Sequence, residues 1–70
     1  MHTLDLHGTR HHAVDSKVEN FVLMNQSEVP LTIICGNSQK MIDLVNAVLN
    51  RIECENVVMD RYGVIVIREL

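Results

Sequence analysis

Two stretches of this sequence share one layout, in which a short apolar segment ends at a glycine and a helix-like run follows. Residues 3–6 precede Gly8, and residues 31–35 precede Gly36. Alternating or β-branched apolar residues favour strands, and glycine ends them. Beyond each glycine, apolar side chains recur at the spacing of one helix face. They are Val14, Val18, Phe21 and Val22 in the first run, and Met41, Leu44, Val45, Val48, Leu49 and Ile52 in the second. The pattern predicts two successive strand–helix units.

The helix boundaries follow from capping residues. Thr9 is expected to cap a first helix that ends near Asn25, and residues 26–29 are expected to form a loop. Either Asn37 or Ser38 is expected to cap a second helix that ends near Glu53.

Two more strands are predicted at residues 57–60 and 64–68, in a hairpin closed at Gly63. Residues 64–67 are apolar on both faces of a strand, which favours an interior position. Right-handed crossovers make the first three strands parallel and leave the fourth antiparallel. We therefore expect an α/β, two-layer sandwich with the element order βαβαββ. Its four-stranded mixed sheet has the strand order 1-2-4-3 and one open face.

Length and composition limit the class of protein. The chain has 70 residues, enough for a single domain spanning residues 1–70 with a thin core. It has one Tyr, one Phe and no Trp, so aliphatic and Met side chains must form that core. The longest charge-free apolar run, residues 64–67, is far shorter than the roughly 20 residues that span a bilayer, so we expect no membrane partner.

The beginning of the chain and its thiols indicate a cytoplasmic protein. Asp5, Arg10 and histidines interrupt the first dozen residues, so no signal peptide is expected, and Met1 favours a chain encoded as it stands. Cys35 and Cys54 are too few for a disulfide scaffold. We expect reduced thiols, although one disulfide bridge stays open as an alternative.

The charge balance argues against a chain that holds nucleic acid by bulk electrostatics. Six basic residues stand against nine acidic ones, a net charge of −3 with neutral histidines. All four histidines lie within the first twelve residues, and their protonation would change the formal charge from −3 to −3 + 4 = +1. Binding to a polyanion is therefore expected to be weak and to depend strongly on pH and salt.

The first strand carries the most informative polar residues. Side chains alternate across a strand, so Leu4 and Leu6 point to one face, and Asp5 and His7 share the other. A carboxylate that holds a histidine in one tautomer prepares it for general acid–base catalysis, and Gly8 would admit a ligand close to the turn. The alternative is a solvated surface pair.

Two helix starts are candidates for phosphate binding, because free N–H groups and the helix dipole favour anions there. Parallel strands would place the two loops side by side at their carboxyl ends. The phosphate-binding candidates are Gly8, Arg10, His11, Gly36, Asn37, Ser38 and Lys40. Ordinary capped helix starts are the alternative interpretation. Arg61 and Arg68 either extend a phosphate track or are merely solvated, and Tyr62 is the only aromatic candidate for base stacking at a surface.

We predict neither a metal nor another cofactor. Asp5, His7, His11 and His12 could be drawn as a metal cluster, but a glycine turn separates the histidines that a single helix would have to align. Cys35 ends an apolar strand and has no partner that would form its thiolate, so we do not expect it to act as a nucleophile.

Taken together, the segments resemble an Smr domain, the small MutS-related module, in a short stand-alone form. Residues 4–8 and Arg10 are similar to that family's opening signature, LDLHGxR. Residues 33–36 resemble its second motif, a TGxG or HGxG loop, with Cys35 in the place of Thr or His and Ser38 in the place of the second glycine. Residues 63–68 resemble its closing strand, a glycine followed by alternating apolar residues and a basic one.

The resemblance implies a βαβαββ fold like that of the C-terminal domain of translation initiation factor 3, nucleic-acid binding and, in several members, endonuclease activity on DNA or RNA. The family's catalytic Asp and His fall on Asp5 and His7, and its phosphate-binding loop on Gly36 and its neighbours. The leading hypothesis is accordingly a nucleic-acid-binding domain that cleaves or nicks phosphodiesters as a hydrolase or RNase-type enzyme. The alternative is a non-catalytic module whose open sheet face binds nucleic acid, a protein or a second copy of the chain.

Overall fold

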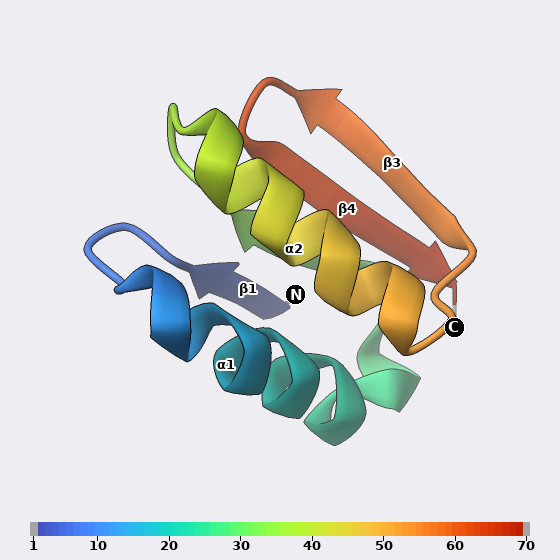
Figure 1. The fold of residues 1–70 in the computed structure, drawn as a ribbon. Coiled ribbons are helices and arrows are strands. Elements are labelled where there is room, and N and C mark those ends of the chain that lie inside the picture. Colours follow the sequence, from blue (N-terminus) through green and yellow to red (C-terminus); the bar gives the residue numbers. More distant parts are fainter. Residues whose placement is uncertain (1, 70) are drawn as a thin grey trace.

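The computed structural model describes residues 2–69, and its elements follow the predicted order (Figure 1). A short 3-10 helix, η1, falls within the predicted loop before β2. The elements are β1 (His2–Asp5), α1 (His11–Met24), η1 (Gln26–Glu28), β2 (Leu31–Ile34), α2 (Gln39–Arg51), β3 (Asn56–Arg61) and β4 (Val64–Glu69).

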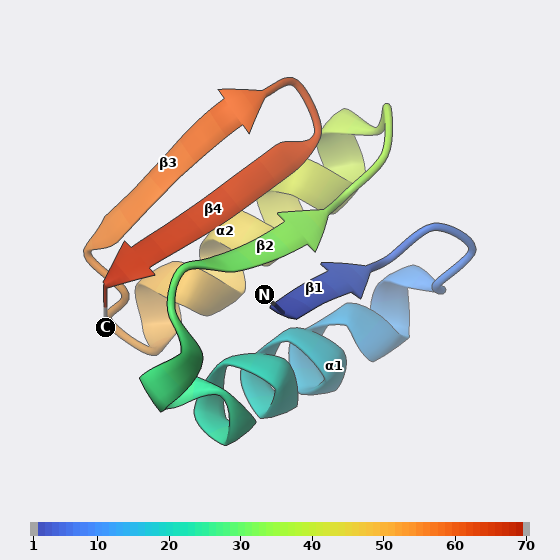
Figure 2. The ribbon, with the colours of Figure 1, turned by 180° about the vertical axis from the view of Figure 1, so that it is seen from behind.

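The strands form one mixed sheet in the order β1-β2-β4-β3, as the sequence predicts. β1 and β2 are parallel, and β4 is antiparallel to both β2 and β3. The interior place of β4 agrees with its apolar side chains on both faces. Both α-helices cover one face of the sheet and leave the other open (Figures 1 and 2). The register places Thr3, Thr32, Val66 and Val58 in one row across the four strands.

The core lies between the helices and the sheet, and its buried residues are aliphatic or sulfur-containing. Among residues 2–69 no polar or charged side chain is buried. The core consists of Leu6, Val14, Val18, Val22, Leu31, Ile33, Cys35, Met41, Ile42, Val45, Val48, Leu49, Ile65 and Ile67. Of the predicted helix stripes, Phe21, Leu44 and Ile52 are only partly buried. Ile42, which the stripe omitted, is buried because α2 packs on the sheet with a wider face than a strict stripe provides.

The two helices begin differently. Thr9 is not the cap of α1, because the helix begins two residues later, at His11, and the Thr9 N–H donates to the carbonyl of Leu6 at 2.9 Å within the preceding turn. Arg10 takes the cap position without a side-chain hydrogen bond. Ser38, one of the two residues predicted as the cap, caps α2. Its Oγ accepts a hydrogen bond from the Met41 N–H at 3.2 Å.

At the C-terminal end of α2, the last residue of the helix also joins it to α1. α2 ends at Arg51, slightly before the predicted Glu53, because Glu53 has a left-handed φ of 62°. Arg51 crosses to α1, with Nη2 at 2.9 Å from Glu19 Oε1 and Nη1 at 3.9 Å from Asp15 Oδ2. Among the described residues, neither helix has the length and apolarity that crossing a bilayer requires.

The hairpin turn between β3 and β4 lies directly against the loop after β2. The Cys35 N–H donates to the carbonyl of Gly63 at 2.6 Å. A Cβ on Gly63 would lie 2.3 Å from the carbonyl oxygen of Gly36, so only glycine fits there. Gly63 also has a φ of 86°, which L-residues with a Cβ rarely adopt.

We expect Gly63→Ala to destabilise the fold more than Gly8→Ala, which serves as its matched control. Gly8 has a similar φ of 81°, but a Cβ there would meet nothing within 4 Å. Gly8→Ala should therefore cost only the left-handed strain, about 1 kcal/mol. Gly63→Ala adds a backbone clash and should cost about 2 kcal/mol more. Urea unfolding of both variants measures the difference in the free energy of unfolding. Equal losses of stability would show that the backbone relieves the clash at no energetic cost.

Candidate functional site

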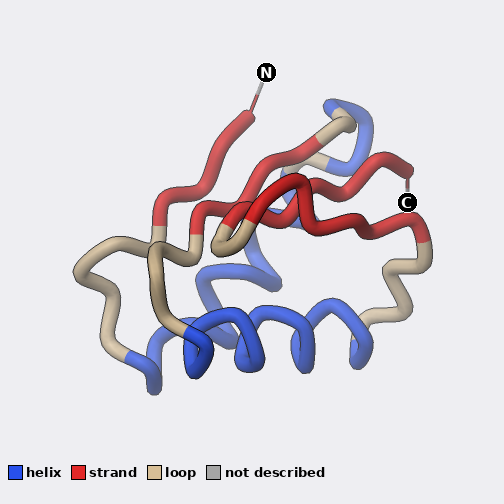
Figure 3. Tube along the Cα trace, turned by 90° about the horizontal axis from the view of Figure 1, so that it is seen from above, coloured by secondary structure: helices blue, strands red, loops and turns tan. Residues whose placement is uncertain are grey.

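Three loops lie next to one another along one edge of the sheet (Figures 2 and 3). They are residues 6–10 after β1, residues 35–38 after β2, and residues 61–63 at the hairpin turn, and we call them together the loop edge. The parallel pairing of β1 with β2 puts their carboxyl ends side by side, and β4 begins beside them. Both α-helices also begin at this edge (Figure 1). The fold thus brings together all the phosphate-binding candidates.

Asp5 and His7 interact through the backbone. The Asp5 carboxylate accepts a hydrogen bond from the His7 backbone N–H, with Oδ1 2.9 Å from the nitrogen. No hydrogen bond joins that carboxylate to the His7 imidazole among residues 2–69, and both side chains are exposed. Asp5 therefore fixes the turn that carries His7, whereas the sequence had predicted that it would orient the ring. The imidazole faces solvent.

The first helix start offers an uncapped set of donors. The first N–H groups of a helix have no partner within it, and no side chain caps α1. Arg10 and His11 are exposed at this position. Gly8, just before them, has open space where a Cβ would lie. Backbone and side-chain donors at this point are suited to binding an anion.

At the start of the second helix, one of the backbone N–H groups is already bound by the capping side chain. The Ser38 hydroxyl oxygen accepts from Met41, which leaves its hydrogen as the group that can donate to a ligand. Asn37 and Lys40 are exposed beside it. Gly36 has a φ of 76° and open space at its Cβ position. This loop can contribute Lys40 and a few polar donors to the same edge.

Tyr62 is connected to α2 by a contact that the sequence did not reveal. Its hydroxyl donates to Oε1 of Gln39 at 3.1 Å. The amide nitrogen of Gln39 in turn donates to Asp43 Oδ1 at 2.9 Å. Tyr62 and Gln39 are 23 positions apart, and no local pattern joins residues at such a separation. The link places an exposed aromatic ring beside the second loop.

Charge is unevenly distributed between the two ends of the strands. Arg10, Lys40 and Arg61 lie at or beside the loop edge together with His7, His11 and His12. The carboxylates of Asp5, Asp43 and Asp60 lie there as well, so this edge is formally neutral while the histidines are neutral. Four of the nine carboxylates lie near the opposite edge, those of Glu28, Glu53, Glu55 and Glu69. Arg68 is also near that opposite edge, because β4 starts at the hairpin turn and runs away from it. It is therefore not part of a phosphate track with Arg61.

Neither cysteine is placed for nucleophilic chemistry at the loop edge. Cys35 is 3% exposed and faces the core. Burial raises the pKa of its thiol, and burial also raises the pKa of the half-buried Cys54 thiol. Both cysteines are free thiols. Among residues 2–69, no group of three His, Cys, Asp or Glu side chains is arranged to hold a metal ion.

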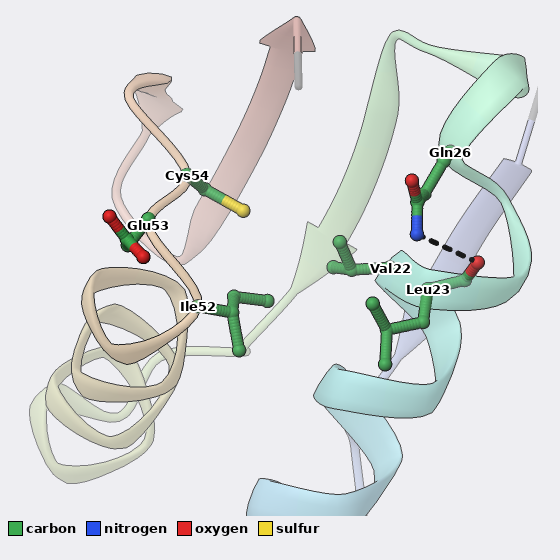
Figure 4. A pocket seen from close by; sticks show the side chains of 6 residues that line it. All are labelled: Val22, Leu23, Gln26, Ile52, Glu53 and Cys54. Carbon is green, nitrogen blue, oxygen red and sulfur yellow. Dashed lines mark hydrogen bonds between the residues drawn. The ribbon is translucent and has the colours of Figure 1, made fainter.

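A small pocket lies at the other end of the helices (Figure 4). Its lining comes from the last turn of α1, from η1 and from the three residues that follow α2. The lining residues are Val22, Leu23, Gln26, Ile52, Glu53 and Cys54. Gln26 is held there by a hydrogen bond from its Nε2 to the Leu23 carbonyl at 3.4 Å. The pocket does not adjoin the loop edge and contains none of the predicted site residues.

Comparison of the chain with protein-family models, with curated proteins and with solved structures finds no match.

We expect alkylation of the folded protein to distinguish the two thiols. Thiolate is the reactive form, so a raised pKa leaves less of it at a given pH and slows the reaction. Because Cys35 is also enclosed by the core, iodoacetamide at mildly alkaline pH should modify Cys54 first. Peptide mass spectrometry over time measures both sites. Denaturant should equalise them, and equal rates in the folded protein would contradict the enclosure of Cys35.

Proposed function

We propose that this chain is an Smr-like nucleic-acid-binding domain that cleaves phosphodiesters at its loop edge. The observation that carries the proposal is the convergence of the segment 4–10 with the second loop and two helix starts on one edge. The similarity of that segment to the LDLHGxR signature supports the same assignment. The edge offers cations, backbone donors and exposed imidazoles, of which His7 lies in the segment that resembles the signature, and these are groups that phosphodiester cleavage uses.

In the proposed reaction on RNA, His7 acts as a general base at the 2′-hydroxyl. The 2′-oxygen attacks the adjacent phosphorus, its proton passes to the imidazole, and the bond from phosphorus to the 5′-oxygen breaks. The 5′-oxygen takes a proton from solvent water as it leaves, and the imidazolium returns its proton to solvent, so the products carry a 2′,3′-cyclic phosphate and a 5′-hydroxyl. Arg10 and Lys40 stabilise the charge that develops on the phosphoryl oxygens. This route needs no metal ion.

Asp5 is a positioning residue in this proposal. Its carboxylate holds the peptide N–H of His7 and so fixes the direction in which the imidazole leaves the turn. An asparagine amide oxygen could accept the same hydrogen bond, whereas an alanine could not. Substitutions at this position therefore separate the geometry of the turn from the charge of the carboxylate.

We expect His7→Ala to reduce RNA cleavage about a hundredfold or more, because it removes the general base. Asp5→Ala should also lose most activity, whereas Asp5→Asn should retain it. The assay incubates labelled single-stranded RNA and supercoiled DNA with the pure protein, with and without chelator, and far-UV circular dichroism checks each fold. Cleavage by His7→Ala at the parental rate would exclude the mechanism. Loss in Asp5→Asn would show that the charge itself matters.

We expect Arg10→Gln and Lys40→Gln each to weaken nucleic-acid binding and to reduce the salt slope by about one, because each contacts one phosphate. Arg51→Gln is the matched control, since it removes the same charge at the other end of α2. Fluorescence anisotropy of a labelled oligonucleotide over a range of salt concentrations measures all three. Equal effects from Arg51→Gln would show that only net charge matters and not the loop edge.

A binding module without catalysis is the second candidate. Two observations favour it. One is the net charge of −3, and the other is that the Asp5 carboxylate binds a backbone N–H, so that within residues 2–69 the His7 imidazole has no hydrogen bond to a carboxylate. The same cleavage assay separates the candidates. Binding with no cleavage of RNA or DNA by either the parent or His7→Ala would assign the domain to recognition.

A further inference from the structure

We propose that Tyr62 is a stacking platform for an unpaired base, so that the ligand of the loop edge is a single-stranded nucleic acid. This inference rests on the proposed function and specifies its substrate class. The position of the Tyr62 ring at the surface supports this assignment. Tyr62 is 54% exposed at the hairpin turn, and the other aromatic residue of the chain, Phe21, packs against the core. Among the described residues, Tyr62 is thus the one Phe, Tyr or Trp ring exposed at the loop edge, beside the smaller imidazoles of the histidines there.

The ring is held in place from its far end. Its hydroxyl is bound to Gln39, and Gln39 is bound to Asp43 one turn further along α2. These contacts restrict the ring while leaving much of it open, which lowers the entropy that a stacking partner has to remove.

The backbone beneath the ring is also fixed. Gly63, the next residue, lies against Gly36 so closely that no Cβ fits between them, and its carbonyl accepts from the Cys35 N–H. The turn therefore cannot move independently of the second loop. The ring keeps its position relative to Asn37, Ser38 and Lys40.

The anchor of the ring determines which part of a nucleic acid the edge would fit. Gln39 lies between Ser38 and Lys40, so the aromatic surface adjoins the residues proposed to bind phosphate. Each nucleotide of a single strand likewise offers a base next to a phosphate. In a duplex the base faces are covered by their neighbours, and a side chain at the surface cannot stack on them. The arrangement therefore favours single strands with a low sequence preference.

The experiment uses the chain's own fluorescence. It contains one Tyr and no Trp, so tyrosine emission reports Tyr62 alone. We expect oligouridylate or oligothymidylate to quench this emission, and an abasic oligomer of equal length to quench it far less. In anisotropy titrations, Tyr62→Leu should bind about tenfold more weakly with an unchanged salt slope. Tyr62→Phe, the matched control, keeps the ring and should bind within about threefold of the parent.

Different results separate the failure of this inference from that of the proposed function. Salt-dependent binding that is the same for the parent, Tyr62→Leu and the abasic oligomer would overturn stacking and leave phosphate binding intact. Equal affinity for a blunt duplex and a single strand would overturn the substrate class. The absence of binding to every nucleic acid would overturn both. Far-UV circular dichroism of Tyr62→Leu excludes unfolding as the cause of weaker binding.

Discussion

The loop edge depends on one place where two backbones touch. Gly63 meets Gly36 without space for a side chain, and a hydrogen bond from Cys35 to the Gly63 carbonyl joins the same two segments. This contact connects the hairpin at the end of the chain to the first half of the fold. It also positions the ring of Tyr62 relative to the start of α2, so one packing constraint determines the arrangement of several groups at the edge.

The architecture was predictable because it depends on local patterns. Apolar residues on both faces of residues 64–67 favour an interior strand with a neighbour on each side, and the hairpin makes β3 one of these neighbours. With right-handed crossovers, the order β1-β2-β4-β3 follows. The helix stripes identified most of the buried helix residues in the same way, although they omitted Ile42 and included Phe21, Leu44 and Ile52, which are only partly buried. The burial of Ile42 depends on how α2 lies on the sheet, which periodicity alone does not determine.

The details of the candidate site were less predictable, because they come from hydrogen bonds with several competing partners. Alternation along β1 placed Asp5 and His7 on one side but did not show that the carboxylate would bind a backbone N–H. Thr9 was a reasonable cap by residue type, yet it lies in the turn that follows Leu6, and the helix starts at His11. The bond between Tyr62 and Gln39 joins distant segments and follows only from the packed fold.

The separation of charge between the two sheet edges has a consequence for how the molecule meets other charged bodies. A net charge of −3 repels a polyanion at long range, but unequal ends also give the molecule an electric dipole. Within roughly 8–10 Å, the screening length at physiological salt, a dipole feels a torque that turns its less negative end, the loop edge, toward the polyanion. Encounters would then be few but mostly in one orientation. Protonation of the histidines near the loop edge would increase both the torque and the rate of association with the polyanion.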